Sequence, residues 1–327
     1  MAHTEPRLFG HWVRNGGWTA RYVSREIANG IRIHSDLSRT RESPRLGGQV
    51  RPRGKVRLCS FCFLQRRNGC YRANLRFRRL EIVEMQAKPF EGQVALVTGA
   101  AKRIGRSIAL RLAAHGADVA VNYNLSAADA RMVTGEIFAL GRKAVAIQAD
   151  VSKRGDVAKM IAAVEKEFGR LDILVNNAGV FFSAKFEELT DEQWDRIMNA
   201  NLKSQFLCSQ AAAPIMKRQG RGRIINLSSL GGMLPWPTFA HYCVSKAGSI
   251  MLTRCLARAL APEILVNSVA PGTIQFPGEA PDEDYIRRAP LRRTGIGDDI
   301  AAAVAYLASS DFVTGQIIAV DGGRILV

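Results

Sequence analysis

The sequence predicts an α/β fold in which helices cover both faces of a doubly wound parallel sheet. From about residue 90 onward, short apolar runs alternate with amphipathic stretches of helical periodicity. The apolar runs are continuous, which is typical of strands buried on both faces of a parallel sheet. Ligands of such sheets bind beyond the carboxyl ends of the strands, where the strand order reverses.

The pattern contains seven strands and six helices. The predicted strands cover residues 94–97, 119–123, 144–149, 171–175, 223–227, 265–269 and 316–320. The predicted helices cover residues 106–115, 127–140, 157–168, 192–218, 239–260 and 298–307, with an irregular segment before the last of them. Thr190 and Gln193 form a capping-box pattern that introduces the long helix over residues 192–218. One domain over residues 85–327 accounts for all of these elements.

Residues 1–84 differ in kind from this domain. They hold 18 of the 46 Lys and Arg but only 6 of the 29 Asp and Glu, and they show no sustained helical or alternating period. We predict a non-globular basic extension, disordered or foreign to the natural protein, because Met85 directly precedes the ordered pattern. A nucleic-acid-binding arm, a transit peptide and a zinc knuckle on Cys59, Cys62 and Cys70 are the alternatives, although the knuckle lacks a nearby fourth ligand.

The composition fits a globular cytoplasmic protein. Hydrophobic residues make up 47% of the chain and charged residues 23%, and the apolar runs are too short for a membrane span. The six cysteines are scattered, which indicates reduced thiols rather than a disulfide framework. We expect no metal site and no membrane association.

The first predicted strand runs into a turn that contains two glycines and precedes a helix. Gly99 permits the tight turn, and Gly105 lets the helix approach the strand. The helix then offers free N–H groups and the positive end of its dipole to a pyrophosphate. Taken alone, such a loop is a weak signal.

Further motifs follow this loop in order along the chain. They are Asp150, Asn176-Asn177-Ala178-Gly179, Asn201, Ser229, Tyr242 with Lys246, and Pro271-Gly272-Thr273. With the closing Val320-Asp321-Gly322-Gly323, they resemble the short-chain dehydrogenase/reductase family over residues 90–323. This resemblance implies a single Rossmann domain that transfers hydride between a nicotinamide cofactor and a carbonyl or alcohol.

Tyr242 and Lys246 lie four residues apart on a predicted helix, so they share one face. An ammonium close to a phenol is expected to lower the tyrosine pKa toward neutral pH. The resemblance implies that Tyr242 donates a proton to the substrate oxygen, that Lys246 also holds the nicotinamide ribose, that Ser229 positions the carbonyl and that Asn201 anchors a water of the proton relay. His241 points about 100° away from Tyr242 on the helix, so we predict a packing or surface role for it.

The predicted cofactor is NADP(H). The second strand ends in Asn122-Tyr123-Asn124, without the carboxylate that usually binds a free 2′-hydroxyl, whereas Lys102 and Arg103 can bind a 2′-phosphate. The predicted cofactor-binding residues are Gly99, Lys102, Arg103, Ile104, Gly105, Tyr123, Asp150, Val151, Asn177, Ala178, Gly179, Tyr242, Lys246, Pro271, Gly272 and Thr273. The resemblance implies that Asp150 contacts the adenine amino group and Thr273 the nicotinamide carboxamide.

Two interpretations of the substrate stay open. Overall resemblance favours a 3-oxoacyl-acyl-carrier-protein reductase, and the loop residues 100–105 resemble those of pteridine reductases. Phe181 and Trp236 are predicted to form an aromatic wall against the substrate, and the acidic residues 282–284 in the substrate lid predict a small, uncharged carbonyl or pterin-like molecule.

The family resemblance also implies a homotetramer or homodimer. A nonenzymatic nucleotide- or RNA-binding protein is the alternative from another class. The presence of both Tyr242 and Lys246 argues against it, and we expect no nucleic-acid partner.

Overall fold

The computed structural model describes residues 10–13, 17–20, 62–67, 70–75 and 88–327. The chain divides into two units, residues 1–83 and 84–327. The first unit contains two antiparallel hairpins, β1 (Gly10–Val13) with β2 (Gly17–Ala20) and β3 (Cys62–Arg67) with β4 (Cys70–Leu75). Cys62 pairs with Leu75 and Cys70 with Arg67, so this register places the two cysteines at opposite ends of one hairpin. Cys59 lies outside the described residues, as does most of the predicted basic extension.

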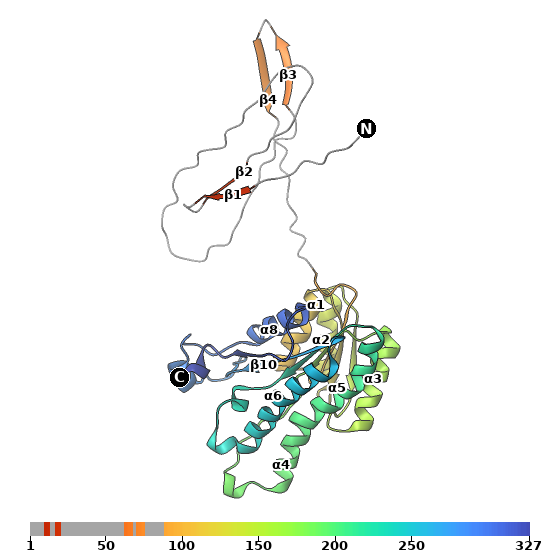
Figure 1. The fold of residues 1–327 in the computed structure, drawn as a ribbon, viewed down its shortest axis with the longest axis vertical. Helices are drawn as coiled ribbons and strands as arrows, with labels where there is room; N and C mark the ends of the chain where they lie inside the picture. Colours follow the sequence, from red (N-terminus) through yellow and green to blue (C-terminus); the bar gives the residue numbers. More distant parts are fainter. Residues whose placement is uncertain (1–9, 14–16, 21–61, 68–69, 76–87) are drawn as a thin grey trace. The chain divides into compact units, whose positions relative to one another are not determined.

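The second unit is built on a seven-stranded parallel sheet, which confirms the predicted fold class (Figure 1). Its strands are β5 (Val94–Val97), β6 (Asp118–Tyr123), β7 (Ala144–Gln148), β8 (Ile173–Asn176), β9 (Gly222–Leu227), β10 (Ile264–Pro271) and β11 (Ile317–Val320). Their order across the sheet is β11-β10-β9-β8-β5-β6-β7. The order therefore reverses between β5 and β8, and the predicted ligand site lies at their carboxyl ends.

Helices cover both faces of this sheet. One core cluster joins the sheet to α1 (Arg103–Ala114), α2 (Ala127–Ala139) and α8 (Gly297–Ser309). The other joins it to α3 (Arg154–Phe168), α5 (Ser204–Arg218) and α6 (Ala240–Leu260). Alternate residues of β5 contribute to the two clusters, Ala95 and Val97 to the first and Val94 and Leu96 to the second. Both faces of each central strand are therefore buried, and for this reason consecutive residues of the strand are apolar.

The predicted long helix over residues 192–218 consists of three pieces. α4 (Asp191–Met198) passes through a π-helical turn, Asn199–Lys203, into α5. The capping box is confirmed, because Gln193 N donates to Thr190 Oγ1 (3.3 Å) and Thr190 N donates to Gln193 Oε1 (3.2 Å). Single π-helical turns inside α-helices are frequent at functional sites. The turn here carries Asn201, one of the predicted catalytic residues.

The predicted irregular segment between β10 and α8 contains one short helix, α7 (Glu283–Arg288). An isolated parallel bridge between Ile274 and Gly295 closes this segment at its base. Among the described residues, no helix has both the length and the apolar character needed to cross a membrane.

Candidate active site

Asn122 at the end of β6 forms hydrogen bonds to the segments at the ends of β5 and β7, next to the point where the strand order reverses. The Asn122 side chain accepts a hydrogen bond from Gly99 N (3.1 Å) and donates to Ile147 O (3.3 Å) and Ala149 O (3.2 Å). Asn122 thus fixes the turn after β5 relative to the ends of β6 and β7. Its sequence position predicted only that this strand end lacks a carboxylate.

Gly105 lets α1 pack against the turn that follows β5. A Cβ atom at this position would lie 2.3 Å from Gly99 O and 2.6 Å from Asn177 Nδ2, both of which belong to the turn and its hydrogen-bonding partner. Lys102, the N-cap of α1, makes no side-chain capping bond. The first N–H groups of α1 therefore have no side-chain partner. They can donate to an anion such as a pyrophosphate at the carboxyl-end edge of the sheet.

The Asn-Asn-Ala-Gly segment after β8 holds the same turn from the other side. Asn177 Nδ2 donates to Thr98 O (2.8 Å) and Gly99 O (3.1 Å). Thr98 Oγ1 accepts from Asn177 N (2.9 Å) and Ala178 N (3.0 Å). The two predicted cofactor segments therefore form one hydrogen-bonded unit, and Thr98 is a member that the predicted site list lacked.

The other predicted cofactor residues belong to segments at the carboxyl ends of the same strands. They are Ile104 in α1, Tyr123 at the end of β6, Val151 after β7, Gly179 after β8, and Pro271, Gly272 and Thr273 at the end of β10. Asp150 follows β7 and accepts hydrogen bonds from Ser152 N (3.0 Å) and Ser152 Oγ (2.7 Å). Burial opposes ionisation of Asp150, but these bonds and Lys153 hold its pKa below the ordinary value.

Lys246 and Tyr242 occupy one face of α6, as their spacing predicts. The ammonium of Lys246 lies 5.7 Å from the centroid of the Tyr242 ring and donates a hydrogen bond to Leu227 O at the end of β9 (2.8 Å). Ser229 Oγ accepts from Gly231 N (3.1 Å). This bond leaves the hydroxyl proton of Ser229 free to be donated to another oxygen.

The pKa shifts at this pair differ from the predicted direction. Burial raises the pKa of Tyr242 above its ordinary value, although a hydrogen bond with the Ser229 side chain opposes the rise. Burial also lowers the pKa of Lys246 to about 8. The tyrosine pKa is therefore raised and not brought toward neutrality, because burial, which disfavours the phenolate, is the largest influence on it.

Asn201 connects the π-helical turn to the segment after β8. Its Oδ1 accepts from Val180 N (2.7 Å), and its Nδ2 donates to Val180 O (3.0 Å) and Ser245 Oγ (3.2 Å). Ser245 Oγ in turn donates to Tyr242 O (2.7 Å). Asn201 is thus a fully buried link between the predicted cofactor segment and the helix that carries Tyr242. Ser245 was not predicted, although its position one helical turn after Tyr242 is a usable signal.

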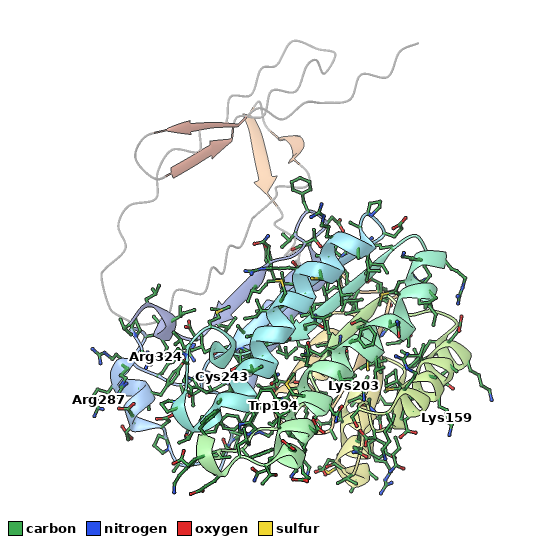
Figure 2. The ribbon with its side chains drawn as sticks, turned by 60° about the horizontal axis from the view of Figure 1, so that its bottom comes forward. Lys159, Trp194, Lys203, Cys243, Arg287 and Arg324 are labelled. Carbon is green, nitrogen blue, oxygen red and sulfur yellow. The ribbon has the colours of Figure 1, made fainter. Side chains whose placement is uncertain are left out.

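Aromatic rings surround the Tyr242 side chain. Trp236 lies parallel to the Tyr242 ring with 6.1 Å between centroids, and Phe181 meets that ring edge-on at 4.8 Å. Phe239 stacks on Phe181 at 4.7 Å. The structure therefore brings both predicted substrate residues to the predicted proton donor and adds Phe239 to them. Figure 2 shows the side chains of this region, with Cys243 of α6 and Trp194 of α4 labelled.

His241 has the predicted packing role. Its side chain is fully buried, and its ring lies 4.9 Å from that of Phe182. Burial lowers the pKa of this imidazole, so we expect it to be neutral at physiological pH.

Comparison with known proteins agrees with this geometry. A family model described as enoyl-(acyl carrier protein) reductase matches residues 99–324. Over 240 residues the chain is 46% identical to the 3-oxoacyl-[acyl-carrier-protein] reductase FabG of Staphylococcus aureus, which covers 71% of this chain and 98% of that protein. A short-chain dehydrogenase from Burkholderia cenocepacia, solved in complex with NADP, is 39% identical with a TM-score of 0.69, covering 72% of this chain and 99% of its own. The chain belongs to the short-chain dehydrogenase/reductase family.

As a short-chain dehydrogenase/reductase, the protein is an oxidoreductase of a family that uses a nicotinamide cofactor. Its structural relatives differ in the form of the cofactor. A 7α-hydroxysteroid dehydrogenase complexed with NADH and 7-oxo glycochenodeoxycholic acid is 32% identical, with a TM-score of 0.69, and covers 72% of this chain and 96% of its own. The turn that contains Gly99 and Gly105 fits such a dinucleotide, and so does the first turn of α1, whose N-cap makes no side-chain capping bond.

Lys102 and Arg103, the two cations predicted to bind a 2′-phosphate, form ion pairs with different segments of this dehydrogenase/reductase. Lys102 Nζ lies 3.1 Å from the carboxylate of Asp129 in the first turn of α2, next to the end of β6. Arg103 instead pairs with Glu279 in the segment after β10. The Arg103 side chain thus lies against the segment after β10 in this structure, and its role toward a 2′-phosphate stays a prediction. No local pattern could have indicated this contact, because Arg103 and Glu279 are 176 residues apart.

One of the three acidic residues at positions 282–284 of the substrate lid is matched by neighbouring cations. Asp284 forms ion pairs with both Arg287 and Arg288 of α7, whereas Asp282 caps that helix by accepting from Tyr285 N (2.9 Å). The i,i+3 and i,i+4 pairs offset the charge of Asp284, so the expected repulsion of anions by residues 282–284 is reduced by this one carboxylate.

Proposed function

We propose that this short-chain dehydrogenase/reductase reduces a small carbonyl compound with NADPH and that Tyr242 is the proton donor. The observation that carries the proposal is the convergence of Ser229, Tyr242 and Lys246 at the carboxyl ends of β9 and β8, beside the turn that follows β5. A polar triad surrounded by aromatic rings suits a substrate that has one oxygen and an otherwise apolar body.

Each member of this triad has a distinct role in the proposed mechanism. A nicotinamide cofactor supplies hydride to the carbonyl carbon when bound. Tyr242 Oη gives its proton to the substrate oxygen, and its raised pKa keeps the phenol protonated at neutral pH until that transfer. The Ser229 hydroxyl donates a hydrogen bond to the same oxygen. The Lys246 ammonium stabilises the phenolate left on Tyr242.

Preference for NADPH over NADH is the first expected result. Tyr123 and Asn124 offer no carboxylate at the end of β6, and Lys102 lies near that position. A cation close to a 2′-phosphate is worth roughly 4 kcal/mol before desolvation at an effective dielectric of 20, so even part of it gives about a tenfold preference. We expect Lys102→Ala to raise KM for NADPH more than KM for NADH. Equal kcat/KM for both cofactors in the unmutated enzyme contradicts this proposal.

The affinity for NADPH is expected to fall as the pH rises through 8. Burial lowers the pKa of Lys246 to about 8 in the free enzyme, and hydrogen bonds that its ammonium donates to the ribose hydroxyls of a bound cofactor favour its protonated form. Binding therefore takes up a proton above pH 8, and Kd rises by up to about tenfold per pH unit. Fluorescence titration with NADPH between pH 7 and 10 measures this slope. The slope should disappear in Lys246→Met, and a flat profile in the unmutated enzyme refutes the assignment.

Two substrate classes are supported by different observations. The aromatic wall of Phe181, Trp236 and Phe239 favours a small, uncharged ketone or a planar pterin-like ring. Identity to the Staphylococcus aureus reductase favours a 3-oxoacyl thioester. A turnover panel of simple ketones, pterins and 3-oxoacyl thioesters with NADPH separates them. A hundredfold preference for the carrier-bound thioester would replace the first class by the second.

We further propose that residues 85–327 hold the whole catalytic domain, because the residues of the site begin at Thr98. We also propose that the enzyme acts in the cytoplasm as a homotetramer or homodimer. Membership of the short-chain dehydrogenase/reductase family supports an oligomer.

A further inference from the structure

The side chain of Arg103 contacts the substrate lid, which comprises residues 273–289. Its guanidinium lies over the ring of Phe276, 4.3 Å from the ring centroid, and pairs with the carboxylate of Glu279. The backbone of Arg103 has a φ of 52°, in the left-handed region that non-glycine residues rarely adopt. Such a conformation persists where the surrounding contacts determine it.

Glu279 is presented to Arg103 by a tight turn. Glu279 N donates to Phe276 O (3.1 Å), and the two residues between them are Pro277 and Gly278, whose φ is 86°. This is the residue pattern of a type II turn. Glu279 Oε2 accepts from Phe276 N (3.0 Å), which leaves Oε1 for the guanidinium of Arg103. Both carboxylate oxygens therefore have a defined donor.

The lid is attached to the domain at its base as well as at this turn. Gln275 N donates to Gly295 O (2.9 Å), and Thr294 Oγ1 donates to Gln275 Oε1 (2.9 Å). α7 forms the last part of the lid and carries Arg287, which Figure 2 labels. Arg103 thus links the turn at Gly278 in the lid to the loop after β5, residues 98–105, which is called the cofactor loop below. The hydrogen bonds of Gln275 hold the base of the lid.

We propose that Arg103 and Glu279 form a clamp that positions the substrate lid against the cofactor loop, and that this clamp sets the affinity for the substrate rather than the choice between NADPH and NADH. The proposal rests on the proposed reductase function. Arg103 acts as a positioning residue here, because its guanidinium is held by Phe276 and Glu279 of the lid. Lys102 instead pairs with Asp129 at the start of α2, next to the end of β6, which is where a 2′-phosphate is expected.

The test compares Arg103→Ala and Glu279→Gln in the full chain. Both side chains are partly exposed, at 57% and 39%, so we expect a rise of about threefold to tenfold in KM for the carbonyl substrate. Kd for NADPH should change by less than about twofold. Hydrogen exchange of the amides in residues 273–282 should become faster in both variants. The charge-swapped double variant, Arg103→Glu with Glu279→Arg, should recover part of the loss.

The ion pair between Arg106 and Glu136 provides the matched control. It has similar exposure, 45% and 38%, and also starts from α1, but it reaches α2 instead of the lid. Arg106→Ala should leave both KM and lid exchange unchanged. A tenfold rise in Kd for NADPH alone in Arg103→Ala, with unchanged lid exchange, overturns the clamp. If no carbonyl substrate is turned over, the proposed function fails, whereas the exchange measurement still decides the clamp.

Discussion

Tyr242→Phe is expected to lower kcat by about 10²-fold or more, the size of effect that loss of a general acid produces. Phenylalanine keeps the ring that stacks on Trp236 and meets Phe181, so the aromatic wall should keep its shape. The bond from Lys246 to Leu227 O does not involve the phenol and should also persist. The variant therefore removes one proton donor from an otherwise intact site.

Binding and chemistry can be measured separately in this variant. Fluorescence titration gives Kd for NADPH, which should stay nearly unchanged, and steady-state assays give kcat. Ser229→Ala is a useful comparison, because Ser229 contributes a hydrogen bond and not the transferred proton. Its loss should be smaller, at about 0.5 to 1.5 kcal/mol of transition-state stabilisation. Normal turnover by Tyr242→Phe would mean that the proton comes from another group.

The fold was predictable because burial on both faces imposes a pattern that the sequence displays directly. Each predicted strand overlaps an observed one, from β5 to β11. The polar motifs could also be placed, because parallel strands put all their carboxyl ends at one edge of the sheet. For this reason Asn177 bonds to Thr98 and Gly99, although these residues lie 79 and 78 positions away in the chain.

Other features depended on contacts between segments that no local pattern encodes. The π-helical turn at Asn201 reflects bonds to Val180 and Ser245, and helical periodicity alone predicted a continuous helix. The direction of the Tyr242 pKa shift depended on the extent of burial, which spacing does not reveal. The partner of Arg103 likewise lies in a lid whose conformation is set by a turn at Gly278.

Gly105→Ala is expected to damage the cofactor site and the stability of the domain together. The added methyl group would lie 2.3 Å from Gly99 O, 2.6 Å from Asn177 Nδ2 and 2.9 Å from Ala100 Cα. Two of these atoms are backbone, and the Asn177 amide is held by bonds to Thr98 O and Gly99 O, so the turn itself must move. Overpacking of this kind costs about 1 to 3 kcal/mol. For a domain of this size, Tm should fall by about 2 to 4 °C per kcal/mol.

Displacement of this turn should also weaken cofactor binding, because the N–H groups that face the pyrophosphate belong to it and to the first turn of α1. We expect Kd for NADPH to rise at least about tenfold, equivalent to about 1.4 kcal/mol, so saturating NADPH should raise Tm less than in the unmutated enzyme. Gly135→Ala in α2 is the matched control, because a Cβ atom there meets nothing within 4 Å. That substitution should stabilise the domain by about 0.5 to 1 kcal/mol, since glycine is unfavourable inside a helix. If both variants bind NADPH with unchanged affinity and Gly105→Ala melts no lower than the unmutated enzyme, the close approach of α1 to the turn is not what makes this site.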